Sequence, residues 1–207
     1  MEKAFKTAVV FVRCHYFTYM IGGAVSLLFL PMAAGMENLD VYRSAKVVEY
    51  CFSLIGMLMM LPLYIPDTDY AALSVIRSKR TSYSWIVLIR LFVEIMYGLL
   101  LLVSLLLIMK AGSSTFPFTY FLVRGLAVML FLGGLSALVY RITRQPIAGL
   151  MVAFLYYLYN LMGKAELLGI FRLFSFAEGT WIEVVVLFLT GVIFLGISLL
   201  LSKNIIE

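Results

Sequence analysis

The chain has 207 residues, of which 64% are hydrophobic and only 13% are charged, and its mean hydropathy is +1.05. Soluble domains carry about 25% charged residues, so this composition excludes an ordinary soluble protein and leaves too little polar sequence for a separate soluble domain. We therefore predict an all-α polytopic membrane protein that forms a single domain over residues 1–207.

The N-terminal segment, residues 1–18, is predicted to be a helix that lies on the membrane surface. At 100° per residue, Glu2, Lys6 and Arg13 point into one narrow arc, and apolar residues point away from it. Such a separation of a polar face from an apolar face is typical of an interfacial helix rather than a spanning one.

Six apolar runs follow this segment. A helix needs about 20 apolar residues to cross the hydrocarbon core, and six such helices with short connections account for the whole length. The connection at residues 37–46 is expected to be an exposed linker. The six predicted transmembrane helices are residues 17–36, 47–65, 86–109, 118–140, 146–162 and 182–202.

The distribution of lysine and arginine predicts the orientation. Ten of the 16 Lys and Arg residues lie at one set of helix ends and six at the other. Cytoplasmic loops are enriched in these residues, so we expect both termini to be cytoplasmic. The net charge of +5 and the isoelectric point near 9.2 then reflect membrane topology rather than nucleic-acid binding. The six residues at the outer ends are Arg43, Lys46, Lys110, Arg124, Lys164 and Arg172.

The longest clearly polar segment is residues 66–85, between the second and third predicted spans. An aspartate at its start can cap a short amphipathic helix, and a basic last turn suits the helix dipole. We expect this helix to contact a cytoplasmic partner; the alternative is a solvated connector whose charges set the topology. The expected contact residues are Asp67, Asp69, Tyr70, Leu73, Ile76, Arg77, Lys79 and Arg80.

Glu94 is the deepest acid of the predicted spans, about two turns into the third. Ionisable residues at membrane depth are functional candidates, so Glu94 is either part of a gate or cargo contact, or a structural partner of Arg90 one turn earlier. Arg124 and Glu183, near the outer ends of their spans, are expected to be interfacial anchors.

The fifth predicted span carries a polar and aromatic stripe. Tyr156, Tyr159 and Asn160 recur at intervals of three and four and are expected to share one face, which either pairs with a neighbouring helix or lines a transport pathway. Residues 163–181 are too broken to span and too apolar for a free loop. They are predicted to form an outer re-entrant or interfacial segment covered by protein, or else an aromatic belt on the outer leaflet.

No catalytic constellation is evident, because the acids are scattered at helix ends and the sequence has one histidine, His15. The methionines within residues 56–60 have no nearby cysteine or histidine in the sequence, so we predict no metal site. Cys14 and Cys51 lie far apart and imply no disulfide. We expect neither catalysis nor a cofactor on this chain.

Taken together, these features resemble the permease subunits of ATP-binding-cassette exporters of the type-2 class. The likeness covers nearly the whole chain, from the amphipathic N-terminal helix through six spans to the semi-polar outer segment. Residues 67–83 resemble the family's loop, in which an acid is followed by an apolar turn and a basic, Ser/Thr-rich turn; the family's acid is usually glutamate, whereas this chain has Asp67 or Asp69. The five residues from Val87 resemble the family's start of the third span.

This resemblance implies that residues 67–80 are a cytoplasmic coupling helix that docks on a separate ATPase subunit. The chain has no Gly-x-x-x-x-Gly-Lys-Ser/Thr phosphate loop, so ATP and Mg²⁺ would bind the partner ATPase. A second permease copy or a sister permease would complete the pore, and residues 163–181 would cap its outer mouth.

The expected function is therefore ATP-driven export of a hydrophobic or amphipathic cargo, such as a peptide, lipid or drug, across a prokaryotic plasma membrane. Two alternatives remain open. One is a substrate-capturing membrane subunit of a vitamin-type importer, and the other is an immunity membrane protein that needs no ATPase.

Overall fold

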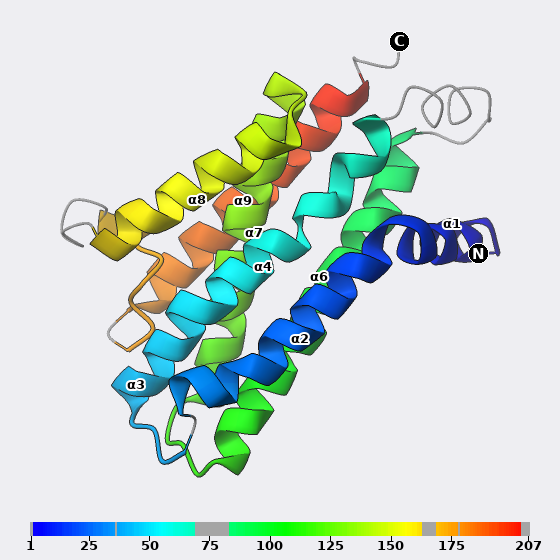
Figure 1. Cartoon of the computed structure of the whole chain (residues 1–207). Helices are drawn as coiled ribbons and strands as arrows, with labels where there is room; N and C mark the ends of the chain where they lie inside the picture. Colours follow the sequence, from blue (N-terminus) through cyan, green and yellow to red (C-terminus); the bar gives the residue numbers. More distant parts are fainter. Residues whose placement is uncertain (1, 36, 69–82, 163–168, 178, 204–207) are drawn as a thin grey trace.

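The computed structural model describes residues 2–35, 37–68, 83–162, 169–177 and 179–203. Every regular element within these residues is a helix, so the predicted all-α fold is confirmed (Figure 1). The elements are α1 (Glu2–Phe11), η1 (Val12–Tyr16), α2 (Phe17–Ala34), α3 (Val41–Lys46), η2 (Val47–Phe52), α4 (Ser53–Met59), η3 (Leu61–Thr68), α6 (Tyr83–Ala111), α7 (Phe118–Thr143), α8 (Pro146–Met162), η5 (Gly169–Phe171) and α9 (Trp181–Lys203).

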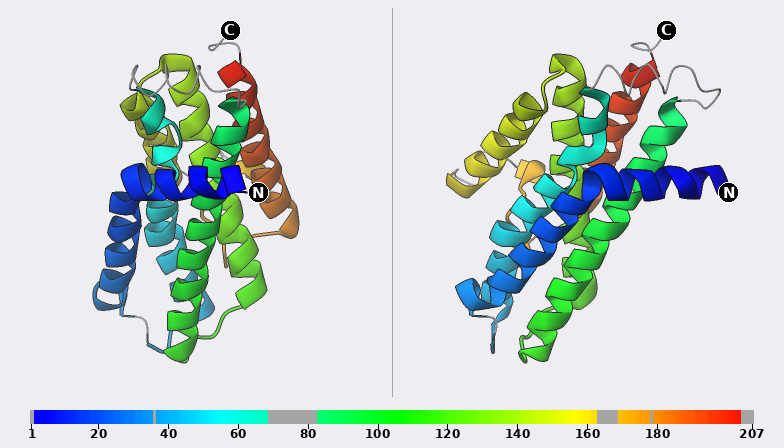
Figure 2. Two further views of the ribbon diagram at one scale, coloured as in Figure 1. Left: turned by 90° about the vertical axis from the view of Figure 1, so that its right-hand side faces the viewer. Right: turned by 45° about the vertical axis from the view of Figure 1, so that its right-hand side comes forward.

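The first elements form one continuous helix that changes direction. α1 and α2 are joined by five residues of π-helix, η1, and α1 turns crosswise to α2 and to the rest of the bundle (Figure 2). A π-turn interrupts the regular hydrogen-bond ladder and is a known cause of helix bending. The predicted N-terminal helix, residues 1–18, therefore ends at a bend rather than at a break.

Several helices have the make-up of membrane spans. By length and composition, five of the described helices could cross a membrane, whereas α8, with 17 residues, is shorter. Membrane-helix character is thus confirmed, and a sixth span is not established by these criteria. The five helical stretches are Phe5–Leu30, Val41–Pro66, Tyr83–Ala111, Phe118–Thr143 and Trp181–Leu201.

The predicted boundaries are close to the observed ones, with one clear error. The bounds of α8, Pro146–Met162, are those predicted for the fifth span. The linker expected at residues 37–46 is wrong in its second half, because α3 begins at Val41 and continues through η2 and α4. Asp40 is extended at the start of α3 and its carbonyl accepts a hydrogen bond from Ser44 N at 2.8 Å, which begins the helix early.

α7 is the central element. It packs against α4, α6, α8 and α9, and most of its side chains are buried. Its approach to α9 is close at Gly134, where an added Cβ would lie 2.7 Å from the carbonyl oxygen of Gly191. Small residues permit such backbone contact between membrane helices.

Segments that are distant in sequence lie near each end of α7. The C-terminal end of α7 lies toward the same end of the bundle as the end of η3, the start of α6 and the end of α9, in the upper part of Figure 1. The opposite end of the bundle holds α3 and the turn between α6 and α7. Both ends of α7 carry a buried arginine, Arg124 and Arg141.

Candidate functional site

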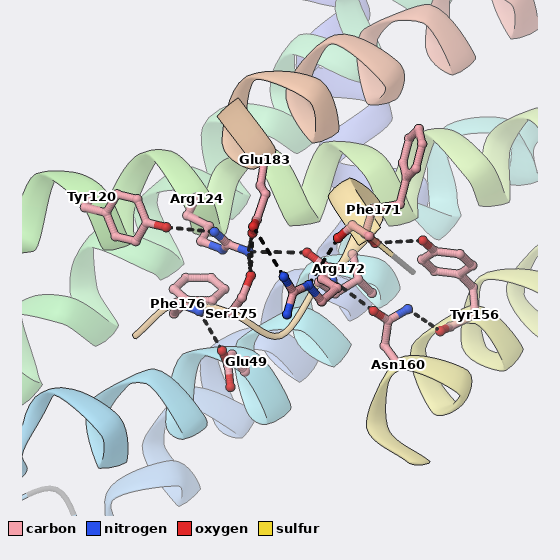
Figure 3. A network of polar contacts seen from close by, with 12 residues as sticks. Glu49, Tyr120, Arg124, Tyr156, Asn160, Phe171, Arg172, Ser175, Phe176 and Glu183 are labelled. Carbon is pink, nitrogen blue, oxygen red and sulfur yellow. Dashed lines mark hydrogen bonds and ion pairs between the residues drawn. The ribbon is translucent and has the colours of Figure 1, made fainter. Parts of the chain in front are cut away.

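The first polar cluster surrounds Arg124, whose side chain is fully buried on α7 (Figure 3). Its Nη2 pairs with Oε2 of Glu183 on α9 at 3.2 Å, and its Nη1 donates to the hydroxyl of Tyr120 at 2.7 Å. It also donates to the hydroxyl of Ser175, which in turn donates to the same carboxylate oxygen at 2.7 Å. The guanidinium lies 5.3 Å from the ring centroid of Phe176. We call Arg124, Tyr120, Ser175, Phe176 and Glu183 the Arg124 network.

Residues 169–177, the return segment, are tied to the surrounding helices through their backbone. Phe176 N donates to Oε1 of Glu49 on η2 at 2.8 Å, and Leu173 N donates to Oδ1 of Asn160 on α8 at 2.9 Å (Figure 3). The hydroxyl of Tyr156 donates to the carbonyl oxygen of Phe171 at 2.9 Å. Irregular backbone is tolerated at membrane depth when protein groups satisfy it in this way.

These contacts correct the expectation that Arg124 and Glu183 are interfacial anchors. Arg124 is 0% exposed and Glu183 is 8% exposed, and they neutralise each other inside the bundle. The second cation near Glu183 is Arg172, at 3.9 Å from Oε1, and its side chain is 36% exposed. The buried charges are therefore part of the internal structure that holds the return segment between α7 and α9.

The three residues that were predicted to share one face of α8 have different surroundings in the structure. Tyr156 and Asn160 are brought together, since Asn160 Nδ2 donates to the carbonyl oxygen of Tyr156 and both side chains contact the return segment. Tyr159 instead is 50% exposed. The inward tyrosine is Tyr157, which is 4% exposed and donates to the carbonyl oxygen of Tyr50 at 2.9 Å. Two residues that are three positions apart on a helix point in directions about 60° apart around its axis. This difference is enough to place Tyr159 and Tyr156 in different surroundings.

The second polar cluster lies at the other end of α7, around Arg141. Its guanidinium carbon is 4.1 Å from the ring centroid of Tyr64 and 5.3 Å from that of Tyr83, and it donates to the Tyr83 hydroxyl. The ring of Tyr64 stacks on Tyr140 at 5.3 Å, and its hydroxyl is 2.6 Å from Oγ of Ser198 on α9. We call Arg141, Tyr64, Tyr83, Tyr140 and Ser198 the Arg141 clamp.

The Arg141 clamp contains residues from both elements that flank the predicted coupling segment in the sequence. Tyr64 belongs to η3, just before residues 67–80, and Tyr83 is the first residue of α6, just after them. Asp67 lies on the end of η3. The other expected partner contacts lie outside the described residues: Asp69, Tyr70, Leu73, Ile76, Arg77, Lys79 and Arg80.

Glu94 is completely buried on α6, and neither of its carboxylate oxygens has a hydrogen-bond partner among the described residues. The structure records no hydrogen bond between Glu94 and Arg90, but the positive charge of Arg90 still acts on the buried carboxyl group, so the expected charge pair stays a prediction. Arg90 instead donates to the carbonyl oxygen of Leu63 at 3.5 Å and lies 5.6 Å from the ring centroid of Phe11. These two contacts come from η3 and α1, which the sequence does not place beside α6.

Sequence reasoning missed several of these residues, notably Glu49, Tyr64, Tyr83, Arg141 and Ser175. Two of them carried a usable signal, since Glu49 and Arg141 are charges within or at the end of apolar runs, and such charges are functional candidates by default. In the part of the chain that the structure describes, no group of three or more His, Cys, Asp or Glu side chains is arranged to hold a metal. Comparison of the chain with protein-family models, curated proteins and solved structures finds no match.

Proposed function

We propose that this chain is the membrane-spanning subunit of an ATP-driven exporter, in which residues 67–80 form a coupling helix docked on a separate ATPase. The observation that carries the proposal is the Arg141 clamp. It joins the residues on both sides of that segment, Tyr64 and Tyr83, to α7 through one buried arginine. A force applied to the segment would therefore reach the central helix directly.

α7 would transmit that movement along its length. Arg141 and Arg124 are 17 residues apart on this helix, a separation of about 25 Å at 1.5 Å per residue. At the far end, Arg124 contacts Ser175 of the return segment and Glu183 of α9. A shift of α7 would thus change the fit of the return segment, which in this proposal caps the outer mouth of the pathway. Packed helices with two alternative arrangements are the physical basis of such coupling.

The proposal includes six spans, with α8 as the fifth and α1 as a helix on the membrane surface. Both termini would be cytoplasmic in a prokaryotic plasma membrane. A second copy of this permease or a sister subunit would complete the pore. ATP and Mg²⁺ would act on the partner ATPase.

The cargo that suits these surfaces is hydrophobic or amphipathic. Of the residues expected to line a pathway, Tyr159 is half exposed beside apolar neighbours, whereas Tyr156 and Asn160 support the return segment and Glu94 is enclosed. Exposed surface on α8 is mainly apolar, including Leu155. Peptides, lipids and drugs with extended apolar surface fit this description.

The test is affinity co-purification from native membranes. Wild type is compared with the triple variant Tyr70→Ala, Leu73→Ala, Arg77→Ala, and a matched control carries Arg43→Ala at the opposite end of the bundle. We expect an ATPase to co-purify with wild type and the control and to be lost from the triple variant at unchanged membrane expression. Recovery of no ATPase even after mild crosslinking would reject the exporter and favour the importer-subunit or immunity alternative.

A further inference from the structure

A cavity lies between the connection that follows α2 and the first turns of the second span. Its volume is about 360 Å³, within the range of about 300–1,000 Å³ that is usual for small-molecule sites. The connection contributes Glu37 and Leu39 to its lining, and α3 and η2 contribute Arg43, Lys46 and Tyr50. We call this cavity the α3 pocket.

The wall formed by the connection is held in place by the turn between α6 and α7. Asn38 N donates to the carbonyl oxygen of Gly112 at 2.7 Å. Leu39 N donates to Oγ of Ser114 at 3.3 Å, and the carbonyl oxygen of Leu39 accepts from Thr115 N at 3.0 Å. Three hydrogen bonds therefore fix two consecutive residues of this wall.

The opposite wall is fixed by α8 and the return segment. The ring of Tyr50 meets the ring of Phe174 edge to face, with 5.4 Å between centroids. The carbonyl oxygen of Tyr50 accepts a hydrogen bond from the hydroxyl of Tyr157 at 2.9 Å. With both walls held by other elements, the α3 pocket is formed before any ligand binds, as most ligand sites are.

The pocket presents charges of both signs. Arg43 and Lys46 are three residues apart on α3 and thus lie on the same side of it. The side chains of Glu37, Arg43 and Lys46 are exposed, and the structure records no hydrogen bond or ion pair of theirs within the described residues. The charge of Lys46 also acts on Glu49, whose Oε1 accepts the hydrogen bond from Phe176 N. Two cations and one acid are therefore available to a ligand in this pocket.

The position of the pocket indicates which ligand is at hand. α3 lies at one end of the bundle (Figure 1), and the helical stretch Val41–Pro66, long and apolar enough to cross a membrane, begins two residues before Arg43. The pocket is therefore at the depth of the lipid head groups, and basic pockets between membrane helices are known to bind them.

The chemistry of the lining selects among lipids. Arginine and lysine bind phosphate through charge-assisted hydrogen bonds. Glu37 offers a carboxylate that suits an ammonium group, and the buried side chains of Leu39 and Val47 provide apolar lining. A ligand with a phosphate, a primary ammonium group and an apolar tail matches all of these groups.

We propose that the α3 pocket binds the head group of an aminophospholipid of the phosphatidylethanolamine type, with its phosphate on Arg43 and Lys46 and its ammonium group on Glu37. This assignment does not rest on the proposed exporter function, because it uses only the membrane character of the chain and the lining of the pocket. The pocket is also at the opposite end of the bundle from the flanks of residues 67–80, so its variants test lipid binding separately from ATPase docking.

The test is native mass spectrometry of the delipidated full chain in detergent, titrated with phosphatidylethanolamine, phosphatidylglycerol or phosphatidylcholine. Wild type should bind phosphatidylethanolamine more tightly than the other two lipids. The double variant Arg43→Gln, Lys46→Gln should lose about tenfold or more in affinity, since hydrogen bonds between charged groups are lost. Glu37→Gln should lose the preference for phosphatidylethanolamine over phosphatidylglycerol. Lys110→Gln is the control and should bind as wild type does, because this exposed cation at the same end of the bundle does not line the pocket.

Three results would overturn the proposal. The first is a double variant that binds phosphatidylethanolamine as tightly as wild type. The second is a wild type without preference for this lipid, which would indicate a general anionic or non-selective lipid contact. The third is displacement of the lipid by an equal concentration of inorganic phosphate, which would assign the pocket to free phosphate. The substituted side chains are exposed, so the variants should fold, and their unfolding temperatures check this.

Discussion

Arg124 of α7 and Glu183 of α9 form an ion pair of 3.2 Å in which the arginine side chain is wholly buried. The hydroxyl of Ser175 contacts both partners, so the pair also holds the segment that returns between α8 and α9. The pair therefore joins two helices and an irregular segment at one point, and its loss should affect all three.

Arg124→Gln should destabilise the protein by about 3 kcal/mol, because removing one partner of a buried ion pair leaves the other charge uncompensated. Arg172→Gln is the matched control. Its side chain lies 3.9 Å from the same carboxylate but is 36% exposed, and exposed pairs contribute about 0–1 kcal/mol. Unfolding in detergent, followed by circular dichroism, measures both variants. Equal losses in the two variants would show that the pair is not buried as described.

The double variant Arg124→Leu, Glu183→Leu should be more stable than Arg124→Leu alone. Two apolar side chains leave no unpaired charge, and such replacements of buried pairs are often neutral or stabilising. The same unfolding measurement on the two single variants and the double variant forms a double-mutant cycle. Strict additivity of the two single losses would contradict a direct interaction.

Tyr156→Phe should loosen the return segment, whereas Tyr159→Phe should not. The first change removes the hydrogen bond to the carbonyl oxygen of Phe171, measured at 2.9 Å, and the second changes a side chain that is 50% exposed. The expected cost of Tyr156→Phe is about 1 kcal/mol, the usual contribution of one hydrogen bond. Amide hydrogen exchange of residues 169–177 is the readout, and faster exchange in both variants or in neither would contradict it.

Arg141→Gln should weaken transport more than assembly if the Arg141 clamp couples the loop to α7. The guanidinium lies 4.1 Å from the Tyr64 centroid, and loss of a desolvated cation–π contact costs up to about 2 kcal/mol. We expect the partner ATPase still to co-purify while cargo-stimulated ATP hydrolysis falls about tenfold. Arg144→Gln is the control, since that side chain is exposed beyond the end of the helix. Loss of ATPase binding in Arg141→Gln would instead assign Arg141 to docking.

The positions of the helices were largely predictable, because apolar runs of the required length leave few alternatives in a membrane protein. α8 begins and ends where its apolar run does, and α6 extends the predicted span by only a few residues at each end. α3 was missed because its charged residues, Arg43 and Lys46, are exposed, whereas only small side chains of this helix, Ser44 and Ala45, are buried. The bend at η1 lies near the point where the amphipathic segment, residues 1–18, gives way to the apolar run 17–36, but the sequence does not show the π-turn itself.

The polar clusters were much less predictable. The sequence shows that Arg124 and Glu183 are charges in apolar surroundings, but it does not show that α7 and α9 are neighbours. Arg90 and Glu94 show a related limit of the sequence. Their spacing of four predicts a local pair, whereas contacts from η3 and α1 provide Arg90 with other partners. Local spacing is a reliable guide only when no neighbouring element offers a competing partner.

The crossing of α7 and α9 offers a sharp test of the fold. A Cβ added at Gly191 would lie 2.7 Å from the backbone of Leu130 and Phe131, so the two helices must separate to accept it. Gly191→Ala should therefore destabilise the bundle by about 1–3 kcal/mol, the usual cost of overpacking.

Gly196→Ala is the matched control on the same helix, because a Cβ there meets nothing within 4 Å. It should leave stability unchanged or raise it slightly, since alanine favours helix more than glycine does. Thermal unfolding of the two variants in the same detergent measures the difference, and a Gly191→Ala variant as stable as Gly196→Ala would mean that α7 and α9 do not cross at this point.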